Sequence, residues 1–215
     1  MAKKELHWEI FDKKRLSLLP KLGFLKKRGF YLAGGTALAL QIKHRLSVDF
    51  DFYNPREFDS EEILLELQKN NREVILIQKS LNTLIVKLDT IETGLFIYPY
   101  KLLKPVIETA YVNLASIEDI AAMKLIAIIQ RGIQRDFIDI YFLIRLLGLQ
   151  KIFRLTKEKY PPFNEYLGLQ AITYFSDAEK ESYKRKMILS ESVTWNQIKN
   201  FLVKQAKEFK ENLKK

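Results

Sequence analysis

The chain has 215 residues, and 47% of them are apolar, a share typical of a packed globular protein. It contains no cysteine, which excludes disulfides, thiolate nucleophiles and cysteine-ligated metals and leaves oxygen ligands for any metal. The formal net charge of +10 favours polyanionic partners, although a lysine-rich solvated surface explains this charge equally well.

The hydropathy pattern predicts a cytoplasmic protein. Residues 1–30 are basic and are interrupted by charges every few positions, unlike the continuous apolar segment of a signal peptide. No apolar run approaches the roughly 20 residues that span a bilayer, so we expect no membrane association.

The first hundred residues alternate strand-like and helix-like patterns. Residues 29–33 predict a strand, 36–45 a short helix and 47–53 a second strand. Three more segments are rich in β-branched and aromatic residues and are joined by the turn-prone stretches "LNT" and "ETG": 73–78, 83–90 and 94–100. Together they predict a small mixed or largely antiparallel sheet with flanking helices.

From Ser116 onward the pattern becomes helical. One helix is predicted from a Ser-x-x-Asp capping signal at Ser116 to Gly132, and another from residue 134 to Gly148. An amphipathic C-terminal helix is predicted from one apolar stripe: Ile198, Phe201, Leu202, Phe209 and Leu213. The expected fold class is α+β, with an α/β domain over 1–115 and a helical domain over 116–215.

Two adjacent glycines, Gly34 and Gly35, separate the first predicted strand from its helix. This arrangement suits phosphate binding, because glycines let a ligand approach the backbone and the free N–H groups of a helix start point at it. Thr36 can cap the helix or hydrogen-bond a phosphate oxygen. Gly-Gly turns before helices are common, so this signal alone does not exclude an ordinary turn.

Asp49 and Asp51 fall in the next predicted strand. The period of two places both carboxylates on one face, with Cβ atoms about 7 Å apart. Two like charges on one strand face repel each other unless a cation neutralises them, and a pair of divalent ions would do so. An edge strand that uses charge against aggregation is the alternative. The nearby Gly-Gly-Thr sequence favours a site.

These motifs resemble a known family. "GGT" followed by "HRLSVDFDF" resembles the first motif of the DNA-polymerase-β-like nucleotidyltransferase superfamily. The later segment "EDIAAMKLIAIIQRGIQRDFIDIYFL" is similar to the second conserved block of the AbiEii/AbiGii toxin-type nucleotidyltransferases. The resemblance covers most of residues 30–147. It implies a mixed α/β nucleotidyltransferase core, a divalent metal such as Mg²⁺ or Mn²⁺, an NTP substrate, and a toxin role beside a cognate antitoxin.

The resemblance also implies roles for individual residues in the first domain. Gly34, Gly35 and Thr36 would hold the nucleotide phosphates, and Asp49 and Asp51 would bind the metals.

In the helical domain, the resemblance implies that Lys124 contacts the triphosphate and that Asp136 is the acid of an Arg-Asp motif. Lys124 lies in a helix that is apolar nearly all round, where a lysine usually has an anionic partner. A solvated lysine at the edge of the core is the alternative. Asp139 is expected to be structural, in an i,i+4 pair with Arg135.

The third carboxylate that this superfamily often carries has no clear counterpart. The strand over 83–90 offers Asp89, whereas the segment 94–100 has only apolar and aromatic side chains around Gly94 and Pro99. If the second segment is the counterpart, the acid is missing and Asp136 or the substrate would have to accept the proton.

Three functions remain open from the sequence. The first is a metal-dependent nucleotidyltransferase that modifies an RNA such as tRNA, for which the basic surface is suited. The second is a nucleotide- or RNA-binding module that has kept the fold and lost the chemistry. The third is a nucleotidyltransferase acting on a small molecule such as an antibiotic, for which a basic surface is unneeded.

Overall fold

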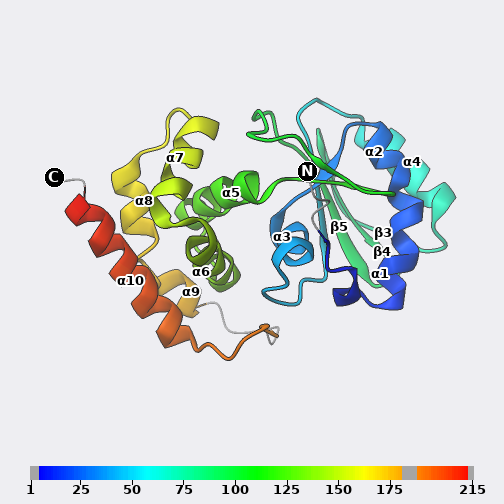
Figure 1. Ribbon diagram of the computed structural model, residues 1–215. Coiled ribbons are helices and arrows are strands. Elements are labelled where there is room, and N and C mark those ends of the chain that lie inside the picture. The colour runs from blue at the N-terminus through cyan, green and yellow to red at the C-terminus, as the bar shows by residue number, and fades with distance from the viewer. Residues whose placement is uncertain (1–4, 181–187, 213–215) are drawn as a thin grey trace. The chain divides into compact units, whose positions relative to one another are not determined.

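A computed structural model describes residues 5–180 and 188–212 of the chain. The chain divides into two compact units, Met1–Ser116 and Ile117–Lys215. Figure 1 shows a sheet with helices in the first unit, whereas the labelled elements of the second unit are all helices. The expected α+β class with a mixed sheet is confirmed.

A seven-stranded sheet in the order β3-β4-β5-β2-β1-β7-β6 forms the centre of the first unit. The pairs β2–β5 and β1–β7 are parallel, and the other neighbouring strands are antiparallel. The strands are β1 (Tyr31–Leu32), β2 (Phe50–Asn54), β3 (Val74–Ser80), β4 (Thr83–Leu88), β5 (Ile91–Ile97), β6 (Ile107–Glu108) and β7 (Asn113–Leu114).

The hairpin between β4 and β5 differs from the sequence prediction. The predicted turn at "ETG" is wrong, because the chain turns earlier, at Asp89, whose φ of 53° is left-handed. Aspartate tolerates this conformation better than most residues. The β-branched Ile91 and Thr93 then continue as strand, so β5 includes Glu92.

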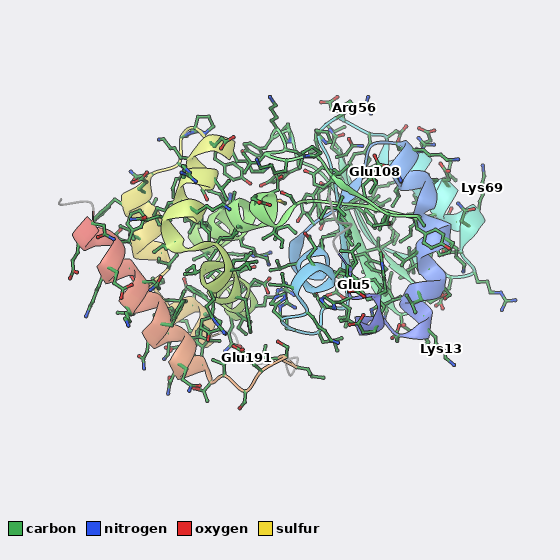
Figure 2. The ribbon with its side chains drawn as sticks, viewed as in Figure 1. Glu5, Lys13, Arg56, Lys69, Glu108 and Glu191 are labelled. Carbon is green, nitrogen blue, oxygen red and sulfur yellow. The ribbon has the colours of Figure 1, made fainter. Side chains whose placement is uncertain are left out.

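Helices cover both faces of this sheet. Figure 1 shows α1, α2 and α4 on one side and α3 on the other. Phe50 and Phe52 of β2 are buried, and the ring centroid of Phe50 lies 5.5 Å from that of Phe11. Exposed charged side chains such as Lys13 and Lys69 point outward from this unit (Figure 2). The helices are η1 (Trp8–Ile10), α1 (Lys13–Leu18), η2 (Leu19–Leu22), α2 (Gly23–Lys27), α3 (Gly34–Ile42) and α4 (Ser60–Asn70).

The boundaries of α3 and β2 set the position of the candidate site. Helix α3 includes both glycines of the Gly-Gly pair and ends at Ile42, because Lys43 adopts a left-handed conformation with φ 51°. Arg45 therefore lies in the connection to β2. Strand β2 begins at Phe50, so Asp49 precedes it and only Asp51 lies within it.

The regular elements in the described residues of the second unit are helices, and Leu189, between α9 and α10, forms an isolated β-bridge. The predicted helices over 116–132 and 134–148 are confirmed as α5 and α6, and the C-terminal helix α10 buries Ile198, Leu202 and Phe209. Leu213 of the predicted stripe lies outside the described residues. The helices are α5 (Ile117–Gln130), α6 (Gln134–Leu147), α7 (Leu149–Lys159), α8 (Glu165–Ala171), α9 (Ser176–Lys180) and α10 (Trp195–Asn212). Within the described residues, every helix is too short or too polar to cross a bilayer.

Candidate active site

The carboxylate of Asp51 lies against the backbone of two glycines. Asp51 pairs with Gly94 across the parallel strands β2 and β5, and its carbonyl oxygen accepts a 3.0 Å hydrogen bond from the Ala33 amide. A β-carbon on Gly34 would lie 3.1 Å from Asp51 Oδ2, and one on Gly94 would lie 3.5 Å from Asp51 Oδ1. The carboxylate therefore sits beside the first residue of α3, where free backbone N–H groups favour an anionic ligand.

Gly35 makes room for a cation of the chain itself. A β-carbon on Gly35 would lie 2.2 Å from Nη2 and 3.2 Å from Cζ of Arg45. Arg45 is only 8% exposed, and its Nη1 donates a 3.2 Å hydrogen bond to the carbonyl oxygen of Leu46. The guanidinium is thus built into the start of α3. Sequence reasoning missed it, although a basic residue between the two motifs was a usable signal.

Thr36 connects α3 to the segment before β2. Its hydroxyl donates to the carbonyl oxygen of Asp49 and lies 2.9 Å from the hydroxyl of Ser47. A phosphate oxygen accepts hydrogen bonds, so Thr36 would have to turn its proton away from Asp49 to bind one. Phosphate binding by Thr36 stays a prediction. The contacts of its hydroxyl with Ser47 and Asp49 position the segment before β2.

The aspartates suit a magnesium ion that is shared with a substrate. Asp49 and Asp51 are both half-buried, whereas Asp89 is exposed in the β4–β5 turn. Among the described residues, no group of three His, Cys, Asp or Glu side chains could hold a metal ion. Mg²⁺ commonly binds one or two protein carboxylates and completes its shell with water and substrate phosphates. The Asp51 carboxylate beside the start of α3, with the half-buried Asp49 two residues before it, fits that pattern.

Strand β5 carries an acid that the sequence analysis missed. The alternation of side chains places Glu92 on the same face of the sheet as Gly94, and therefore on the face of Asp51. Glu92 is exposed and lies opposite Lys87 of β4. The earlier start of β5 is the reason for the omission.

A second charged cluster lies within the helical unit. The Nζ of Lys124 is 2.9 Å from Oδ1 of Asp136 and 2.6 Å from Oδ2 of Asp139, and both aspartate side chains are fully buried. Arg131 Nε donates a 2.8 Å hydrogen bond to Oδ2 of Asp136. Burial alone would raise the pKa of Asp136, but the charges and hydrogen bonds of Lys124 and Arg131 outweigh it and hold that pKa below its ordinary value.

This cluster confirms that Lys124 has anionic partners. Asp139, which we expected to pair with Arg135, binds Lys124. Lys124 and Asp136 belong to the second unit, and Asp49 and Asp51 to the first. The contact of Lys124 with a triphosphate stays a prediction.

Comparison with known proteins gives a family and a fold. Residues 24–76 and 81–205 match the model of the family described as "Nucleotidyl transferase AbiEii toxin, Type IV TA system". The uncharacterized protein aq_aa25 of Aquifex aeolicus strain VF5 is 37% identical over 193 residues, which cover 85% of this chain and 89% of that protein.

Two solved structures share the fold at low sequence identity. JHP933 from Helicobacter pylori has a TM-score of 0.59 and 18% identity, with 97% of this chain and 95% of that chain covered. MenT4, a nucleotidyltransferase toxin from Mycobacterium tuberculosis, has a TM-score of 0.51 and 17% identity, with 89% of this chain and 80% of that chain covered.

Proposed function

The chain belongs to the AbiEii family of nucleotidyltransferase toxins, and we propose that it transfers a nucleotidyl group from an NTP to an RNA as the toxin of a toxin–antitoxin pair. The family supports a nucleotide substrate and an antitoxin partner. RNA, such as tRNA, is our choice of acceptor because the net charge of +10 attracts polyanions. A cytoplasmic location stays a prediction from the sequence.

The placement of the Asp51 carboxylate between Gly34 and Gly94 supports this proposal most. In it, the phosphates of the NTP bind the free N–H groups at the start of α3, and the Arg45 guanidinium offsets part of their charge. Asp49 and Asp51 would hold Mg²⁺ or Mn²⁺. When bound, the metal would neutralise negative charge on the reacting phosphate and on the leaving pyrophosphate.

Glu92 is the residue that we propose accepts the proton of the attacking hydroxyl. An acceptor oxygen would bond to the α-phosphorus while the bond from that phosphorus to the pyrophosphate oxygen breaks. Asp136 is poorly suited to take the proton, because Lys124 and Arg131 stabilise its ionised form and lower its pKa. Glu92 lies on the face of Asp51 and is open to solvent.

Lys124 is proposed to bind the triphosphate of the NTP. Its ammonium already lies between Asp136 and Asp139. A triphosphate would therefore compete with these carboxylates for the same ammonium, which has three donor hydrogens.

Labelling of RNA tests the proposed function directly. The wild type and Asp51→Asn would each be incubated with one α-labelled NTP at a time, Mg²⁺ and total RNA, with EDTA and Mn²⁺ as further conditions. We expect labelled RNA with the wild type and about 10²–10³-fold slower labelling with Asp51→Asn, the usual loss for one preorganised electrostatic contact. Thermal melting would show that the variant is folded.

The other functions give different results in the same assay. NTP-dependent stabilisation without labelling of any RNA would indicate a binding module and overturn the proposal. Labelling of an added aminoglycoside in place of RNA would indicate a small-molecule acceptor and would overturn it equally.

A further inference from the structure

Aromatic side chains gather on the face of the sheet that carries Asp51. Tyr53 follows Asp51 by two residues on β2, and Phe96 follows Gly94 by two residues on β5, so both rings lie on that face. Three further rings join them through direct contacts. The aromatic cluster consists of Tyr31, Tyr53, Phe96, Tyr98 and Tyr100.

The rings form a connected series that runs from the core to the surface. The ring centroid of Tyr53 lies 6.2 Å from that of Tyr31, 5.6 Å from Phe96 and 5.2 Å from Tyr98, and Tyr98 lies 5.0 Å from Tyr100. Exposure rises along the series, from 2% at Tyr31 to 43% at Tyr100, and the rings between them are half-buried. The cluster is therefore anchored in the core at one end and accessible to a ligand at the other.

We propose that the aromatic cluster stacks with unpaired bases of a single-stranded RNA beside the candidate active site. This inference rests on the proposed function and identifies the acceptor as an RNA with an unpaired segment. A lone NTP base needs one ring, whereas this cluster brings several rings to the surface around Tyr98 and Tyr100, which suits a strand that carries several bases. A duplex conceals its base faces and cannot use them.

Positive charge near Tyr100, the most exposed ring of the cluster, also fits a nucleic acid. Lys101 follows Tyr100 directly, Lys104 lies three residues further along the chain, and both are exposed. Such lysines attract the phosphate backbone, while aromatic rings bind the bases without requiring a particular sequence. The structure thus combines the two features that single-strand binding requires.

Binding of RNA without NTP tests this inference separately from catalysis. The probe is a fluorescein-labelled single-stranded RNA of about twelve nucleotides, a length within the range of known single-strand sites, and affinity is measured by anisotropy at fixed salt. We expect Tyr100→Ala and Tyr98→Ala each to weaken binding by about 5- to 150-fold, the usual range for one stacked base. Tyr100→Phe, which keeps the ring, should bind as the wild type does.

Two controls distinguish stacking from general effects. Tyr174→Ala removes a tyrosine of the helical unit that is 56% exposed, and its binding should be unchanged. Stabilisation by NTP in thermal melts should be unchanged in Tyr100→Ala, because the ring is assigned to the acceptor.

Several outcomes would overturn the inference. These are unchanged binding in both alanine variants, an equal loss in Tyr174→Ala, an equal loss of binding to a blunt RNA duplex, or a loss of NTP stabilisation in Tyr100→Ala. Single-strand binding through these tyrosines without transfer of any nucleotide would overturn the proposed function and leave this inference standing. If the wild type labels RNA but the alanine variants of Tyr98 and Tyr100 bind RNA as tightly as the wild type, the proposed function stands and this inference is overturned.

Discussion

Arg45 and Gly35 share one small space, because the guanidinium lies 2.2 Å from the position that a β-carbon of residue 35 would take. The backbone of Gly35 is not left-handed, so its conformation alone does not require glycine. Gly34 differs, since its φ of 68° favours glycine and its missing β-carbon leaves room for Asp51. The two glycines therefore leave room for the carboxylate of Asp51 and the guanidinium of Arg45 at the start of α3.

Gly35→Ala is expected to act through Arg45. The end of an arginine is flexible, so the new methyl group should displace the guanidinium with a small loss of stability and a clear loss of NTP affinity. Arg45→Ala should weaken NTP binding to a similar degree, and the double variant should lose no more than either single one, because all three remove the same contact. Isothermal titration calorimetry with a non-hydrolysable NTP measures the NTP affinity of the wild type and the three variants.

If the losses of NTP affinity add up in the double variant, Gly35→Ala does not act through Arg45. Gly23→Ala is the matched control, because a β-carbon there meets only the carbonyl oxygen of Tyr111 at 3.8 Å. It should leave NTP affinity unchanged.

Glu92→Gln should lower the rate of nucleotidyl transfer while NTP affinity stays close to that of the wild type. General-base catalysis contributes about 10²–10⁴-fold, and a glutamine cannot accept the proton. Single-turnover rates at saturating NTP measure the effect. Glu73→Gln, an exposed acid next to β3, serves as the control. Glu92 has no catalytic role if both variants transfer at the wild-type rate.

Much of the sheet could be predicted from local pattern. Their content of β-branched and aromatic residues identified the segments of β3 and β4, and two-residue periodicity identified β2 around Asp51. The left-handed Asn82 at the "LNT" turn agrees with the tolerance of asparagine for that conformation. The start of β5 could not be predicted, because Asp89 and Gly94 were both acceptable turn residues and only the pairing with β4 decides between them.

Contacts that form only because the chain reverses direction could not be predicted from the sequence. Arg45 reaches Gly35 only because Lys43 ends α3 in a left-handed conformation and turns the chain back over the helix start. The sequence indicated that Lys124 has an anionic partner, but the identity of Asp136 and Asp139 as partners depends on how α5 packs against α6.

The lowered pKa of Asp136 predicts how stability depends on pH. Because the pKa in the folded state is below its ordinary value of 3.8, the ionised carboxylate stabilises the fold above that value, and this contribution is lost as the pH falls toward the folded pKa. The difference in urea midpoint between the wild type and Asp136→Asn should be constant between about pH 5 and 7 and should shrink below about pH 4. Glu158→Gln, an exposed acid on α7, should show no such trend. A difference that grows on acidification would mean that burial, and not the two cations, dominates at Asp136.

The buried cluster of the helical unit holds two cations and two carboxylates, so its charges sum to zero: Lys124, Arg131, Asp136 and Asp139. Variants that restore this balance can therefore distinguish a structural role of Lys124 from a role in NTP binding. Lys124→Met leaves two buried carboxylates with one cation, and loss of one partner of a buried ion pair usually lowers the free energy of unfolding by about 3–5 kcal/mol. Lys124→Met/Asp139→Asn restores the charge balance, so its urea midpoint should recover much of that loss.

NTP binding should not recover in the same way. If Lys124 contacts the triphosphate, both variants lack the ammonium, and both should show little stabilisation by NTP, even though the double variant is well folded. Asp139→Asn alone, which keeps the ammonium and removes one competing carboxylate, should bind NTP at least as tightly as the wild type. A double variant that is stable and binds NTP with wild-type affinity would show that Lys124 serves only to neutralise the two buried aspartates.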